Sequence, residues 1–130
     1  MDDTFLVITK NELKMFVNVL NKYHNRLKFT HEVENNEESN FLDISVKKRT
    51  NGTVKLDLLK KNAFSGRYVN FQSAHSIQVK IGIVKNLSDK ISKLSDPIFH
   101  NKNFEATKND LILNNYPANF ITKYFEDHKK

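Results

Sequence analysis

The chain has 130 residues, 38% of them hydrophobic, and a formal net charge of +6 at pH 7. Only three Gly, two Pro and no low-complexity run argue against a disordered chain, and the absence of Cys excludes disulfides and thiolate metal sites. No apolar stretch approaches the ~20 residues that span a bilayer, and the acidic N-terminus is unlike a secretory signal. We therefore expect an intracellular protein, cytoplasmic or nuclear, with no membrane partner.

The first part of the chain predicts a short strand and a helix. Residues 5–8 form an apolar run that is typical of a buried strand. Thr9 and Glu12 match a capping box, in which the hydroxyl and the carboxylate each bond a free backbone N–H group. Apolar residues then recur at helical spacing, which predicts a helix over residues 10–26 with one apolar face.

Strands follow this helix. Alternation of polar and apolar side chains predicts three antiparallel strands, at residues 28–34, 41–46 and 54–58. A polar acidic loop is expected at 35–40, and Arg49–Gly52 is a strong turn because Asn-Gly tolerates positive φ. Helix and hairpin each present one apolar face, so a shared core is expected. Its predicted members are Leu13, Phe16, Val17, Leu20, Leu42, Ile44, Val54 and Leu56.

The second half predicts a helical bundle. An irregular aromatic segment over residues 60–73 precedes Ser76, which can cap a helix that ends near Asp96. A second helix is expected over residues 102–115, and Pro117 can begin a third. Three helices with short connections predict a small bundle, so the fold class is α+β.

Charge is spread unevenly along the chain. Residues 1–59 carry nine Lys or Arg and nine Asp or Glu, whereas residues 60–130 carry twelve and six. A basic half beside a neutral half favours a polyanionic partner such as nucleic acid. The helix after Ser76 is expected to hold its cations on the outer face, namely Lys80, Lys85, Lys90 and Lys93.

Two adjacent acids open the chain, at Asp2 and Asp3, immediately before the apolar run. Asp is depleted in strands, and neighbouring carboxylates repel each other unless a cation such as Mg²⁺ shares them. The stretch from Met1 to Phe5 resembles the Tyr-x-Asp-Asp hairpin of reverse transcriptases, entered one residue late. The alternative is that the two acids belong to a solvated N-terminus without a binding role.

Further short motifs resemble the same family in the same order. They are Phe41-Leu42-Asp43, Arg67-Tyr68-Val69-Asn70-Phe71 with Ser73-Ala74-His75, and Asn114-Asn115-Tyr116-Pro117. Together they resemble the C-terminal part of a retroelement reverse transcriptase, Penelope-like or related. The resemblance implies a partial palm over 1–60, with a primer-grip hairpin at 41–59, a linker over 61–75 and a thumb-like bundle over 76–130.

The same resemblance implies a site and partners. Asp2 and Asp3 would be catalytic ligands for Mg²⁺, and the partner would be an RNA–DNA hybrid or a DNA duplex. The nucleic-acid contacts would be Arg67, Tyr68, Lys80, Lys85, Lys90 and Lys93. Asp43 is interpreted as a turn acid and not a metal ligand.

Two alternatives stay open beside a polymerase fragment. We expect the isolated chain not to polymerise, because the earlier metal-binding Asp of such enzymes has no counterpart here. One alternative is a non-catalytic nucleic-acid-binding module resembling a helix-turn-helix, in which the bundle and the hairpin grip a duplex. The other is a retroelement remnant without function. The sequence leaves the oligomeric state open.

Overall fold

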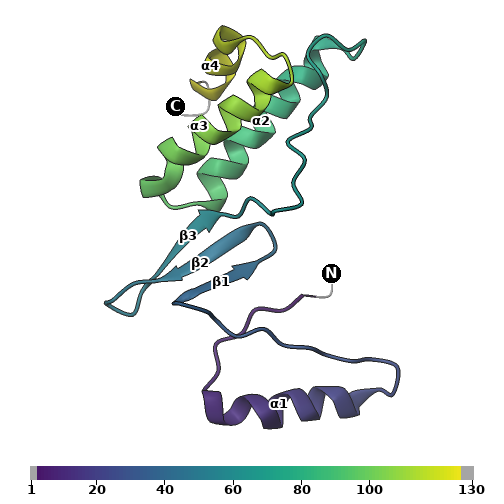
Figure 1. Cartoon of the computed structure of the whole chain (residues 1–130), viewed down its shortest axis with the longest axis vertical. Helices are drawn as coiled ribbons and strands as arrows, with labels where there is room; N and C mark the ends of the chain where they lie inside the picture. Colours follow the sequence, from purple (N-terminus) through teal and green to yellow (C-terminus); the bar gives the residue numbers. More distant parts are fainter. Residues whose placement is uncertain (1–2, 127–130) are drawn as a thin grey trace.

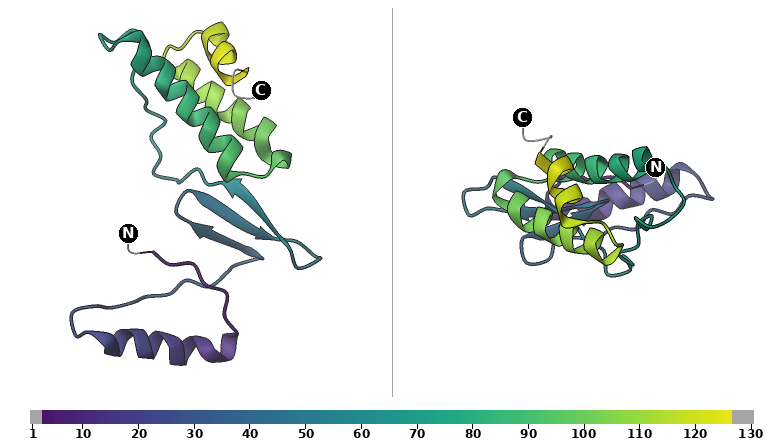
Figure 2. Two further views of the ribbon diagram at one scale, coloured as in Figure 1. Left: turned by 180° about the vertical axis from the view of Figure 1, so that it is seen from behind. Right: turned by 90° about the horizontal axis from the view of Figure 1, so that it is seen from above.

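The computed structural model describes residues 3–126, which form an α+β structure with four helices and one small sheet (Figure 1). The elements are α1 (Lys10–Tyr23), β1 (Glu38–Phe41), β2 (Ile44–Lys48), β3 (Val54–Leu58), α2 (Ile77–Leu94), α3 (Pro97–Leu113) and α4 (Ala118–Glu126). The sheet lies between α1 and the bundle of α2, α3 and α4, and the view from behind shows the same order (Figure 2). No helix within the described residues is long and apolar enough to cross a membrane.

The three strands form an antiparallel meander in the order β1-β2-β3. Phe41 pairs with Ile44, so the chain reverses through Leu42 and Asp43 alone, with Leu42 at a φ of 54°. The second hairpin turns at the predicted place. Gly52 has a φ of 81° and donates its N–H to the Arg49 carbonyl at 3.0 Å, which confirms the expected turn.

The expected strand over residues 28–34 and the expected loop over 35–40 are both wrong. Residues 28–34 lie outside the sheet, whereas β1 forms from the second half of the expected loop. Asn36 and Glu37 adopt positive φ values of 50° and 62°, which reverse the chain just before β1. The tight turn after Phe41 then pairs β1 with β2, and residues 28–34 are left without a ladder partner in the described chain. The apolar run at residues 5–8 forms no strand either.

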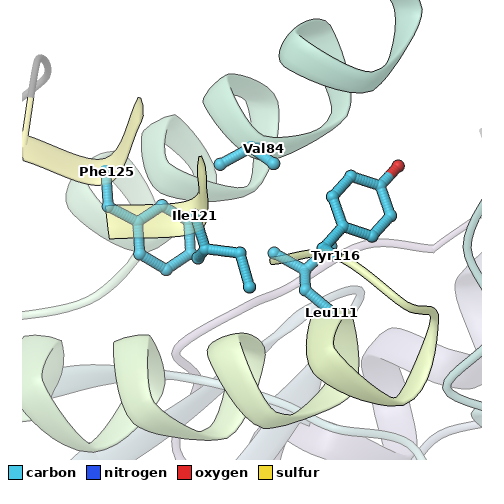
Figure 3. Close-up of a cluster of buried hydrophobic side chains, with 5 residues drawn as sticks. All are labelled: Val84, Leu111, Tyr116, Ile121 and Phe125. Carbon is cyan, nitrogen blue, oxygen red and sulfur yellow. The ribbon is translucent and has the colours of Figure 1, made fainter. Parts of the chain in front are cut away.

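The hydrophobic core lies within the three-helix bundle, as the helical periodicity of the second half predicts. Its buried side chains come from all three helices and the turn before α4 (Figure 3): Val84, Leu111, Tyr116, Ile121 and Phe125. Phe71, Phe104 and Phe120 pack around them. α3 begins at Pro97, five residues before the expected start, because proline suits the first turn of a helix, where no N–H donor is needed.

The core expected in the first half is wrong, because none of its eight residues is buried. The sheet turns its other face to the bundle, so Ser45 and Asp57 are buried while Leu42 and Val54 are 38% and 56% exposed. α1 contains no buried residue. In the first half, α1 and the strands therefore form without a shared hydrophobic core.

Hydrogen exchange should separate α1 from α2. An isolated helix of about 14 residues is marginal in water, so amides of α1 should exchange by local opening, whereas those of α2 should need global unfolding. We expect α1 amides to be at least about a hundredfold less protected than the amide of Val84, whose side chain is fully buried. Exchange followed by mass spectrometry measures both helices in one sample. Equal protection of α1 and α2 would contradict this expectation.

Candidate nucleic-acid interface

The segment before α2 is fastened to the turn between α3 and α4 by one side chain. The Asn114 amide donates to the carbonyl of Gly66 at 2.7 Å, and its oxygen accepts the N–H of Tyr68 at 3.1 Å. The Asn114 carbonyl accepts the N–H of Phe71 at 3.0 Å. Residues 66–71 therefore belong structurally to the bundle and not to a free linker.

Arg67 and Tyr68 are held at this turn in different ways. Arg67 lies between the two residues that Asn114 binds, and its side chain is exposed. Tyr68 is half-buried, with its ring 5.9 Å from that of Phe64. Burial raises the pKa of the Tyr68 hydroxyl, and the negative charge of Asp110 raises it further. Arg67 is thus available for an external anion, whereas Tyr68 mainly packs.

A Schellman motif ends α3 and sets the direction of α4. Asn115 adopts a φ of 65° and donates its N–H to the Ile112 carbonyl at 2.9 Å, while Tyr116 donates to the Leu111 carbonyl at 3.1 Å. Tyr116 and Leu111 also pack together in the core. Asparagine tolerates this left-handed conformation, and Pro117 leads directly into α4.

α4 buries one face and exposes the other. Ile121 and Phe125 point into the core, whereas Asn119, Thr122 and Lys123 are exposed. The hydroxyl of Thr122 donates to the carbonyl of Ala118 at 2.9 Å, so it is already used within the helix. The Asn119 amide oxygen accepts the N–H of Phe120 at 2.9 Å, so the outward groups left for a partner are the Asn119 NH₂ and the Lys123 ammonium.

Two lysines from different helices meet at one aromatic ring. Lys85 of α2 and Lys123 of α4 lie 5.7 and 5.4 Å from the centroid of the Tyr124 ring. Neither ammonium forms an ion pair within residues 3–126. Cations beside a ring are attracted by its quadrupole, which holds them in place without neutralising their charge. We call Lys85, Lys123 and Tyr124 the α2–α4 basic site.

The other predicted lysines of α2 are engaged elsewhere. Lys80 is only 8% exposed, so its expected place on the outer face is wrong. Its ammonium donates to the Ser73 carbonyl at 2.8 Å because the segment before α2 folds back over the start of the helix. Lys90 pairs with Asp43 at 2.9 Å, and Lys93 with Asp89 at 2.8 Å.

Asp43 lies in the two-residue turn between β1 and β2, where a turn acid was expected. The hydrogen bond from Lys90 lowers the pKa of this carboxyl, although burial opposes the shift. This ion pair fastens the turn to α2. Asp43 therefore has a structural role in the described chain.

A buried carboxylate joins the hairpin to α3. Asp57 of β3 accepts hydrogen bonds from Lys102 at 2.6 Å, Asn103 at 3.1 Å and Lys47 at 3.2 Å. Burial raises the pKa of Asp57, but these three donors lower it further than burial raises it, so the pKa lies below its ordinary value. The hairpin is therefore attached to the bundle mainly by polar contacts.

The predicted acidic pair does not form a described metal site. Asp2 lies outside the described residues, and Asp3 is exposed in an irregular segment. Among residues 3–126 no group of three or more Asp, Glu or His side chains could hold a metal ion. Because Asp2 lies outside the described residues, the expected binding of Mg²⁺ by the pair stays a prediction.

Residues 67–126 match a family model described as an animal helix-turn-helix domain. The match begins at Arg67, between the two residues that Asn114 binds, and ends with α4. No curated protein and no solved structure matches the chain significantly. The match therefore covers one structural unit, which starts earlier than the boundary expected at residue 76.

The assignment to a reverse transcriptase is wrong, because no family of that kind matches the chain. That resemblance was the basis for the palm, the thumb, the catalytic Asp pair and its Mg²⁺, so it no longer supports them. The motifs that suggested it have local structural roles: Leu42-Asp43 makes a tight turn, residues 66–71 bind Asn114, and Asn114–Pro117 ends α3. Short motifs of this kind recur wherever the same turn is needed.

Proposed function

We propose that residues 67–126 form a helix-turn-helix unit that binds duplex DNA, mainly through the phosphate backbone. The observation that carries the proposal is the match of this segment to an animal helix-turn-helix domain, over the residues that fold as one bundle. The α2–α4 basic site supports it, because a half-buried lysine of α2 and an exposed lysine of α4 meet there and form no ion pair within residues 3–126. Duplex DNA replaces the RNA–DNA hybrid that the reverse-transcriptase resemblance implied.

The half-buried Lys85 and the exposed Lys123 neutralise phosphates, and the exposed Arg67 contributes another positive charge at the turn that leads into α4. The exposed Asn119 offers its NH₂ as a donor to a base edge, because its oxygen already accepts the Phe120 N–H. One amide and one lysine on the outer face of α4 are a small set for reading sequence, so binding should depend little on base order.

Removing the α2–α4 basic site should weaken binding without changing sequence preference. For Lys85→Ala/Lys123→Ala, affinity for a duplex should fall about tenfold near 0.1 M salt, because two released counterions are lost from the equilibrium. The slope of log affinity against log salt should become about 2 units shallower. Fluorescence anisotropy on two unrelated duplexes of about 24 base pairs measures both quantities.

Lys90→Ala/Lys93→Ala is the matched control, because it removes two charges from α2 that carboxylates already pair. It should change affinity by less than about threefold, since paired lysines release few counterions. If the control weakens binding as much as the Lys85/Lys123 variant, only net charge matters and the proposed interface is wrong. A strong preference for one duplex would contradict backbone binding.

A further inference from the structure

The β2–β3 hairpin carries a second group of cations, which the average charge of the first half conceals. The hairpin contains Lys47, Lys48, Arg49 and Lys55, with Asp57 as its one acid. Lys47 and Lys55 lie directly opposite each other in the ladder, which is unfavourable for like charges. Such an arrangement costs stability and is not needed to form a turn.

Within residues 3–126, one of these four cations has an acidic partner. Lys47 binds Asp57, whereas Lys48, Arg49 and Lys55 form no ion pair within residues 3–126. Lys48 and Arg49 are exposed, and Lys55 is half-buried. Lys48 and Arg49 directly precede the turn and Lys55 lies just after it, so the three charges lie near the turn end of the hairpin. We call Lys48, Arg49 and Lys55 the hairpin-tip cations.

The hairpin is bound to the bundle through Leu56 and Asp57 of β3, the two residues that follow Lys55. Asp96, in the turn between α2 and α3, donates its N–H to the Leu56 carbonyl at 2.8 Å and accepts the Leu56 N–H on its carboxylate at 3.0 Å. Asp57 adds its bonds to Lys102 and Asn103. Two successive residues of β3 are therefore bound to the bundle, which holds the tip in a defined place relative to it.

The tip points away from the bundle, at the other end from α4 (Figure 1). Lys85 lies nine residues before Leu94, the last residue of α2, which is about 14 Å of helix at 1.5 Å per residue. Lys48 and its ladder partner Val54 lie two residues beyond the bound Leu56, or about 7 Å along the strand. Along these elements the two basic surfaces are therefore about 20 Å apart, or about six base pairs of duplex at 3.4 Å per base pair.

We propose that the hairpin-tip cations form a second contact with the phosphate backbone of the duplex bound by the helix-turn-helix unit. The inference rests on the proposed function and adds a surface that lies outside the matched segment. Unpaired charges at a rigidly held tip lose little entropy on binding and release counterions from the duplex. The partner at the tip is a polyphosphate chain, read by its charge and not by its bases.

Lys48→Ala/Arg49→Ala/Lys55→Ala tests the contact. On a duplex of about 24 base pairs near 0.1 M salt, affinity should fall at least about tenfold, and the salt slope should become about 2 to 3 units shallower. A circular dichroism spectrum equal to that of the parent shows that the sheet persists. Lys48→Arg/Lys55→Arg, which retains the charges, should bind as the parent does.

Lys14→Ala/Lys22→Ala/Lys28→Ala is the matched control, because it removes three exposed charges from and beside α1. It should change affinity by less than about threefold. If the hairpin variant behaves like this control while Lys85→Ala/Lys123→Ala still weakens binding, the second contact is wrong and the proposed function stands. If the hairpin variant loses binding to phosphatidylserine vesicles but not to DNA, the tip is a membrane contact and the inference also fails.

Discussion

Replacing Leu111 by alanine should destabilise the bundle by about 3 to 4 kcal/mol, since a fully buried leucine leaves a cavity that a packed core cannot fill. Leu111 belongs to the buried cluster with Val84, Ile121 and Phe125 (Figure 3). It also packs against Tyr116 in the motif that ends α3. Urea unfolding followed by circular dichroism gives the free energy of unfolding for the parent and the variant.

Leu20→Ala is the matched comparison, because it makes the same substitution in α1. Leu20 is only partly buried, so its truncation should cost about 1 kcal/mol or less. The pair of variants distinguishes the core predicted from the first half of the chain from the core that forms in the second. If Leu20→Ala lowered the free energy of unfolding more than Leu111→Ala does, the main stabilising core would include α1, and this prediction would be wrong.

Replacing Asp57 by asparagine should cost about 2 kcal/mol near pH 6, because a buried, charged acceptor of three hydrogen bonds becomes a neutral one. Its side chain is 3% exposed, so water cannot replace the lost bonds without opening the interface. The hairpin and α3 should separate more readily as a result. Urea unfolding at several pH values measures the cost.

The pH dependence of this loss has a defined sign. Since the folded-state pKa of Asp57 is lowered, its stabilisation is complete above the unfolded pKa of about 3.9 and disappears as the pH falls through the folded value. The difference between parent and variant should therefore shrink between about pH 5 and pH 2. Asp43→Asn removes an exposed carboxylate and should show a smaller change. A difference independent of pH would show that Asp57 stabilises by shape and not by charge.

The sequence alone determined the features that depend on near neighbours. Helical spacing of apolar residues predicted the three helices of the second half, because one apolar stripe on each can be buried against the other two. Gly52 marked a position of positive φ and adopts it. Among the three helices of the second half, the start of α3 was misplaced, because Pro97 begins a helix as readily as it ends one.

Packing between distant segments decided the rest. The alternation predicted β3, but the strand expected over residues 41–46 is wrong, because the turn at Leu42 and Asp43 divides it between β1 and β2. The side of the hairpin that faces the bundle was set by Asp57, which bonds Lys102 and Asn103, 45 and 46 residues away. Hydrophobicity alone predicted that the face with Leu42, Ile44, Val54 and Leu56 would be buried. The opposite face packs on the bundle because the partners of Asp57 belong to α3.

The candidate sites depend on the same long-range contacts. Four lysines spaced along α2 looked alike in the sequence, yet Lys80 turns inward to Ser73, and Lys90 and Lys93 meet carboxylates. Lys85 alone reaches the ring of Tyr124, beside a Lys123 that no local pattern connected to it. Whether a lysine is free to bind a phosphate depends on which acids and rings the fold brings within a few ångströms of it, and spacing along one helix does not contain that information.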